Sequence, residues 1–300
     1  MTPNSLTVFT AACIASLSFA QADDWRYGLP DTGLTPSSFS YEGVVRADAR
    51  DGQSAFGVQS IGISVPLSDP RKSGYQKWIF SAELDMNLSA VSSYGGFNLS
   101  EDYFYSLDLP IALIRSYESG NRLTMAILPS LACDMGHTDG GFTMGAMAQY
   151  RIAVNENFSY SLGLAYSPRY VKFGFLPLVG FEWKINEQWS LEMEKMSLAL
   201  NYSSSENLKY GPFIGYSSNS WTAHTEQGAR WLSYSSLVCG IQSEILLPSS
   251  PGNKHIINVA VGMSIFTRAE TRFRNWDRDR DFRRYYEPAL YLSAGIDLRF

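Results

Sequence analysis

The sequence Pro288-Ala-Leu-Tyr-Leu-Ser-Ala-Gly-Ile-Asp-Leu-Arg-Phe300 alternates between two kinds of residue. Every second position, counted back from the end, is apolar: Phe300, Leu298, Ile296, Ala294, Leu292 and Leu290. The other positions are small or polar apart from one tyrosine: Arg299, Asp297, Gly295, Ser293, Tyr291 and Ala289. Because successive side chains of a β-strand point to opposite faces, this period of two predicts a strand with one apolar and one polar face.

The same alternation recurs along most of the chain upstream. It is clearest over 75–88, where Trp78, Phe80 and Leu84 share one face and Glu83 and Asp85 the other. With the closing stretch, it predicts thirteen strands: 39–48, 54–67, 75–88, 102–117, 123–133, 142–154, 158–166, 175–183, 189–201, 208–216, 231–247, 255–267 and 288–300. Most exceed the five or six residues usual in soluble proteins, and a membrane-spanning strand needs about 9–11. The pattern therefore indicates an all-β protein with membrane-length strands.

The composition suits such a protein. Of the 300 residues 14% are aromatic and 18% are charged, while the mean hydropathy is only −0.13. Membrane barrels use aromatic residues in their interfacial girdles. No segment after residue 22 has the roughly 20 apolar residues of a transmembrane helix, so a membrane location would require a closed barrel. The net charge of −5 argues against a nucleic-acid partner, which would favour a basic surface.

Residues 1–22 have the features of a secretory signal peptide. Leu6 to Ala20 is apolar, and Ala20-Gln21-Ala22 fits a signal peptidase site. Residues 23–38, rich in Gly, Pro, Ser and Thr, are expected to be irregular, and residues 39–300 to form the barrel domain. The remaining cysteines, Cys133 and Cys239, lie in predicted strands without metal-type spacing, and we expect no cofactor and no metal.

The closing stretch resembles the last strand of bacterial outer-membrane β-barrels, which typically ends in Phe with apolar residues at alternate positions before it. The resemblance implies a closed antiparallel transmembrane β-barrel in the cell outer membrane, in contact with lipid and lipopolysaccharide. It also implies that the barrel-assembly machinery recognises Phe300, Leu298 and Ile296. The hairpin over 175–193, with Trp183 and Trp189 beside an Asn-Glu turn, is similar to hairpins of uncharacterised outer-membrane barrel families, and this similarity implies no activity.

Strand number and orientation follow from parity. Single-chain bacterial barrels have an even number of strands, so thirteen segments predict a barrel of 12 strands, with 14 as the alternative; the region 189–224 is the hardest to assign. If the closing strand ends in the periplasm, the short connections 118–121, 155–157, 185–188 and 247–254 all fall there. The longer stretches 89–101 and 268–287 then become outer loops, as is usual for barrels.

Charged residues on the polar strand faces are predicted to point into the lumen. They are Glu83, Asp85, Asp108, Arg151, Glu182 and Lys184. In an open pore such groups tune ion selectivity, whereas in a narrow barrel they would pair and fill the interior. A barrel of about 12 strands allows either outcome.

The histidines offer the only candidates for acid–base chemistry. His137 and Asp139 in a predicted outer loop resemble the Asp-His pair of the omptin proteases, although the second carboxylate pair of that family has no counterpart here. His224 precedes Ser233, Ser235 and Ser236, which allows a Ser-His arrangement like that of outer-membrane lipid hydrolases. The simpler interpretation is that both are solvated loop histidines, and His255 is expected at a periplasmic turn.

The stretch 268–287 interleaves seven arginines with five acidic residues and several aromatic residues. The arginines Arg278, Arg280, Arg283 and Arg284 could bind phosphates or anionic sugars. Alternatively, the nearly balanced charges pair with one another and hold the segment together. Taken together, the sequence predicts a non-enzymatic pore, small-solute channel or structural barrel, with an outer-membrane lipid hydrolase or omptin-like protease as the alternative. It indicates neither the solute nor the oligomeric state.

Overall fold

A computed structural model describes residues 37–67, 78–94, 97, 99–137, 141–167, 175–194, 196–225, 228–248, 254–273 and 282–298. Within them the chain is all-β, and no helix is long and apolar enough to cross a membrane. The seventeen strands are β1 (Ser37–Asp48), β2 (Ala55–Pro66), β3 (Trp78–Tyr94), β4 (Tyr103–Asp108), β5 (Ile111–Ser116), β6 (Arg122–Asp134), β7 (Phe142–Asn155), β8 (Phe158–Tyr166), β9 (Leu176–Lys184), β10 (Trp189–Glu194), β11 (Ser197–Ser205), β12 (Leu208–Thr225), β13 (Gly228–Pro248), β14 (Lys254–Ser264), β15 (Thr267–Phe273), β16 (Phe282–Tyr286) and β17 (Ala289–Leu298).

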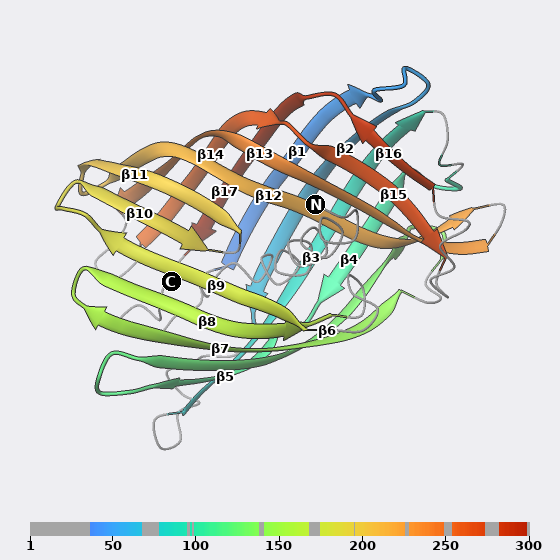
Figure 1. Cartoon of the computed structure of the whole chain (residues 1–300). Helices are drawn as coiled ribbons and strands as arrows, with labels where there is room; N and C mark the ends of the chain where they lie inside the picture. The colour runs from blue at the N-terminus through green and yellow to red at the C-terminus, as the bar shows by residue number, and fades with distance from the viewer. Residues whose placement is uncertain are drawn as a thin grey trace, which may run out of the picture.

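The strands form one closed antiparallel ring (Figure 1). Three positions in it are shared by two consecutive segments. β4 and β5 both lie between β3 and β6, β14 and β15 both pair with β13, and β16 and β17 continue each other beside them. The ring therefore has fourteen positions, the second of the two counts that the sequence allowed, and β1 closes it by pairing with β17.

The strand that the sequence count missed lies within 189–201. The prediction of a single strand there is wrong, because β10 ends at Glu194 and β11 begins at Ser197 and pairs back along it. Met196, between them, has a φ of +65°. This left-handed conformation is usually taken by Gly or Asn, so no turn residue in the sequence marked the reversal.

Replacing Met196 by glycine is expected to stabilise the barrel by about 1 kcal/mol, because glycine adopts positive φ without the steric cost of a Cβ. The free energy of unfolding in urea, measured on protein refolded into lipid vesicles, checks this. Gly120→Ala, at a turn where φ is +80°, should shift stability in the opposite direction. A destabilised Met196→Gly variant would contradict the conformational argument.

The two faces of the wall have opposite character. On the outside, apolar side chains such as Ile61, Leu88 and Leu164 are 45–54% exposed. On the inside, Glu83 and Asp85 are buried at 3% exposure. A soluble protein would place these residues the other way round, whereas a transmembrane barrel needs an apolar band toward lipid. The chain is therefore a closed antiparallel transmembrane β-barrel, as the alternation predicted.

The connections 117–121, 156–157, 185–188 and 206–207 are short and lie at the end of the barrel where Ser37 pairs with Leu298. We call this the terminal end. At the opposite end, the prediction of an outer loop over 268–287 is wrong in its described part. Most of that stretch forms β15 and β16, which pair with each other, and β3 likewise extends through Tyr94 into the predicted loop 89–101.

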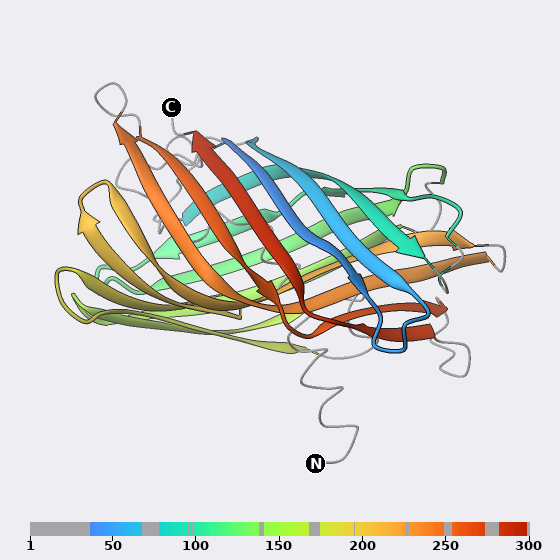
Figure 2. The same ribbon diagram turned by 90° about the horizontal axis from the view of Figure 1, so that it is seen from above.

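Away from the terminal end the barrel narrows. Thr222 of β12 pairs in parallel with Cys133 of β6. This pair brings together two strands that are six positions apart in the fourteen-strand ring. β7 has by then separated from β6, and β11 from β12, so that β7 to β11 stop short while the β12–β13 hairpin continues (Figures 1 and 2). At the end of the barrel opposite the terminal end, a narrower ring therefore comprises nine strands: β1, β2, β3, β4, β6, β12, β13, β15 and β16.

The narrow ring is filled by an apolar plug, and we call this end the plug end. Its large side chains, all at most 4% exposed, are Phe56, Phe97, Phe104, Trp221, Leu232, Tyr234 and Tyr286. Phe56 packs against Phe97, Tyr234 and Tyr286 with ring centroids 5.6–5.9 Å apart. A ring of about eight strands is just wide enough for side chains to fill it, so the plug follows from the pinching of β6 against β12.

Two prolines and a bulge mark the level at which the wall bends. Pro110 separates β4 from β5 and Pro288 separates β16 from β17, and neither can donate a ladder hydrogen bond. Between β13 and β14/β15, the interval Ser264 to Arg268 faces the shorter interval Val238 to Ser235. The extra residue is a β-bulge, which bends a strand and increases its twist.

Candidate functional site

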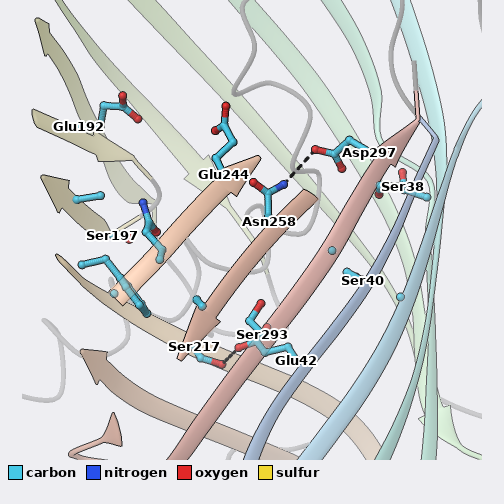
Figure 3. Close-up of a pocket in the computed structure, with 18 of the residues that line it drawn as sticks. Ser38, Ser40, Glu42, Glu192, Ser197, Ser217, Glu244, Asn258, Ser293 and Asp297 are labelled. Atoms are coloured by element: carbon cyan, nitrogen blue, oxygen red, sulfur yellow. Dashed lines mark hydrogen bonds between the residues drawn. The ribbon is translucent and has the colours of Figure 1, made fainter. Parts of the chain in front are cut away.

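The lumen between the plug and the terminal end contains a cavity of about 540 Å³. Its lining begins at Ser38 and Asp297 at the terminal end and reaches Ser197, next to the Met196 turn, at the other end of β10 and β11. Figure 3 shows side chains of β1, β13, β14 and β17 pointing into this common space. A fourteen-strand ring is wide enough to leave such a space, which the nine-strand ring above is not.

The inward residues change from polar to apolar along single strands. On β1, Ser38, Ser40 and Glu42 line the cavity and Val44 belongs to the plug. On β13, Glu244 and Gln242 line it and Leu232 lies in the plug. The strands therefore carry two different interiors, a wet one near the terminal end and a dry one near the plug end.

Carboxylates dominate the charged lining. There are seven of them, Glu42, Glu83, Asp85, Glu182, Glu192, Glu244 and Asp297, against three cations, Arg122, Arg151 and Lys209. Four of the carboxylates lie on β1, β3 and β17, where the described lining includes no cation, and two of the cations lie on β6 and β7. The cavity therefore has a negative electrostatic potential, which is strongest along the part of the wall formed by β17, β1, β2 and β3.

Hydrogen bonds and ion pairs hold many lining groups in place. Arg151 of β7 contacts Glu182 of β9 at 2.6 Å across the intervening β8, and Lys209 lies 3.5 Å from Glu244. On the acidic wall, the Asn258 amide donates to Asp297 at 3.3 Å, and the Ser217 hydroxyl donates to Glu42 (Figure 3). These neutral donors orient the two carboxylates.

Four of the six predicted lumen charges line the cavity: Glu83, Asp85, Arg151 and Glu182. Lys184 is exposed at the end of β9, and Asp108 lies beside Asp85 in register on β4; the described lining contains neither. Glu42, Arg122, Lys209 and Glu244 also line the cavity and were not among the predicted lumen charges. Their parity along each strand is the signal that could have found them, since each alternates with outward apolar residues.

In the structure His137 and His224 both contact the carboxylate of Asp134, a residue that the sequence did not predict as their partner. Its Oδ1 lies 3.0 Å from His137 Nδ1, and its Oδ2 lies 2.8 Å from His224 Nδ1. Asp139 lies outside the described residues. Ser233 is four strand positions from His224 in the β12–β13 register, about 13 Å at 3.3 Å per residue, and its hydroxyl donates to Glu270.

Of the four arginines predicted to bind anions, Arg278 and Arg280 lie outside the described residues. Arg283 and Arg284 belong to β16. Arg283 donates to buried Glu270 at 2.9 Å, and Arg268 and Arg272 also contact that carboxylate. Arg284 pairs with Asp51 at 3.1 Å. Both described arginines thus contact acidic groups of the barrel itself. Of the predicted assembly signal, Leu298 and Ile296 lie on β17 and Phe300 lies outside the described residues.

The fold and the lumen define the protein as a transmembrane β-barrel with a polar cavity under an apolar plug. The chain belongs to the family described as Domain of unknown function (DUF6268), whose model matches residues 47–299. No curated protein shows significant sequence similarity to it.

Several solved outer-membrane proteins have a similar course. The chain resembles the toluene transporter TodX of P. putida, with 10% identity, 96% of this chain and 94% of that chain covered, and a TM-score of 0.40. It also resembles an outer membrane channel from Pseudomonas putida F1 (8%, 89% and 96%, 0.40) and a mutant porin of Rh. blastica (9%, 89% and 99%, 0.31). None of these likenesses bears on what the present chain binds.

Proposed function

We propose that the chain is an outer-membrane channel for small polar solutes, with a preference for cations. The observation that carries the proposal is the polar cavity that extends from the terminal end to the turn between β10 and β11. A closed barrel with an apolar outer face and a predicted signal peptide supports the outer-membrane location. The terminal end then faces the periplasm.

The route for solutes runs beside the plug. The plug occupies the ring of nine strands, whereas β7 to β11 form an arc of the wider ring outside it. Residues of that arc, including Tyr160, Glu182, Glu192 and Ser197, line the cavity together with those of β1 and β17. A solute that follows the arc meets serine, asparagine and charged side chains, which replace part of its hydration.

Planar-bilayer recording on the purified, refolded protein tests the proposal. Steady unitary conductance steps are the expected result, because a cavity with water-exposed charges conducts ions. A barrel that inserts, migrates in a heat-modifiable way on gels and yet never conducts would refute the channel and favour a structural barrel.

The acidic lining predicts that potassium is more permeant than chloride. Replacing Glu42 by Gln together with Asp297 by Asn is expected to lower the permeability ratio of potassium to chloride roughly twofold or more, since lumen charges set selectivity. The reversal potential in a potassium chloride gradient measures this. Glu287→Gln removes one exposed carboxylate outside the described cavity lining and serves as the control for a change of surface charge. An equal shift in both variants would contradict the role assigned to the lumen.

A further inference from the structure

We propose that Asp134, His137 and His224 form a binding site for a divalent transition metal of the zinc type at the seam between β6 and β12. The three residues come from segments up to 90 positions apart, and each offers one ligand atom, all within 4.8 Å of one another. Two imidazoles and one carboxylate form a donor set that suits zinc and its neighbours in the transition series. The site is distinct from the cavity and its proposed transport role.

The backbone brings the three side chains together. Asp134 is the last residue of β6, His137 follows in the turn, and His224 lies near the end of β12. The carbonyl of His224 accepts the N–H of Ser100 at 3.0 Å, and its N–H donates to Asp134 Oδ2. The pair of Thr222 and Cys133 lies next to the cluster, on the side of the terminal end. The cluster is therefore built on two strand ends that pair with each other.

The distances suit a shared metal ion. Zinc binds histidine nitrogen and carboxylate oxygen at about 2.0–2.2 Å in a tetrahedral arrangement, so neighbouring ligand atoms lie roughly 3.4 Å apart. The Asp134 oxygens lie 2.8 and 3.0 Å from the two Nδ1 atoms. The imidazole rings are stacked with centroids 3.8 Å apart, so that both Nδ1 atoms lie beside the same carboxylate.

The burial of the three side chains leaves access from one side. Asp134 and His224 are 1% and 13% exposed, and His137 is 44% exposed. A metal would therefore reach the site past His137 and keep an open coordination position for water, as zinc sites with three protein ligands do. The Glu101 carboxylate lies near Gly136, the residue before His137.

Calorimetric titration of the purified, chelator-treated protein with zinc tests the inference. The expected result is one ion per chain, with affinity at least about tenfold weaker in Asp134→Asn, His137→Ala and His224→Ala, since even outer-shell changes cost that much. His255→Ala, which alters a histidine at the terminal end of β14, should bind zinc as the unaltered protein does.

Two results would overturn the inference. One is the lack of one-to-one zinc binding by the unaltered protein. The other is binding of equal affinity in the unaltered protein and the His137→Ala/His224→Ala double variant. Heat-modifiable migration on gels, recorded for each variant, separates loss of the site from loss of the fold. Because conductance is recorded separately, failure of the metal site leaves the proposed channel untouched.

Discussion

Trp221→Ala is expected to lower the free energy of unfolding by about 3–5 kcal/mol, the cost of truncating a large buried aromatic residue. Trp221 is 2% exposed and packs against Phe104 with ring centroids 5.3 Å apart. It also lies beside Thr222, which makes the single pair between β12 and β6. Its loss leaves a cavity in the plug at the seam that defines the narrow ring. Urea unfolding in lipid vesicles, followed by far-ultraviolet circular dichroism, measures the change.

The matched control is Leu290→Ala on the lipid-facing side of β17, where Leu290 is 42% exposed. Lipid can refill the space there, so only the transfer free energy of the lost carbons remains, about 1.5 kcal/mol. If the two variants lose the same stability, the plug is not a packed core. The Trp221 variant should also raise conductance, because water can then enter the nine-strand ring.

Glu270→Ala is expected to cost about 3–5 kcal/mol, since it leaves buried positive charges without their counter-charge. Glu270 is 3% exposed on the inner side of β15 and contacts Arg268, Arg272 and Arg283. The guanidinium groups of Arg268 and Arg272, which are 10% and 18% exposed, would then be like charges in a poorly solvated site. The same unfolding measurement reports the loss.

The exposed pair between Arg284 and Asp51 gives the comparison. Both side chains are more than a third exposed, so Asp51→Ala should change stability by less than about 1 kcal/mol. Restoring charge balance with a second change, Arg272→Met, should recover part of the loss in the Glu270 variant. A Glu270→Ala barrel as stable as the Asp51→Ala barrel would show that the arginines reach solvent.

Prediction from the sequence succeeded where the pattern was local. The segment 158–166 forms β8 with the predicted bounds, and the polar face of 75–88 lines the lumen through Glu83 and Asp85. Both follow from a period of two read within one strand. The prediction failed at Met196, where a non-glycine residue takes positive φ. A turn without turn-forming residues leaves no trace in composition.

The candidate sites show the same division. His137 and His224 stood out as two of only three histidines, but their contact with Asp134 joins positions 90 residues apart. Such a contact exists only because β12 crosses to β6. The sequence alone also left an open and a filled lumen as alternatives. The structure contains both along the barrel axis: the cavity near the terminal end and the plug at the other end.

By itself, then, the sequence determined that this protein forms long two-faced strands, that those strands close into a membrane barrel, and that their polar faces point inward. These properties depend on the alternation of neighbouring residues. Only the tertiary structure decided the number of strands, the plug beside the cavity and the grouping of Asp134 with two histidines. They depend on which distant strands pair, and a single parallel pair between Thr222 and Cys133 changes the ring from fourteen strands to nine.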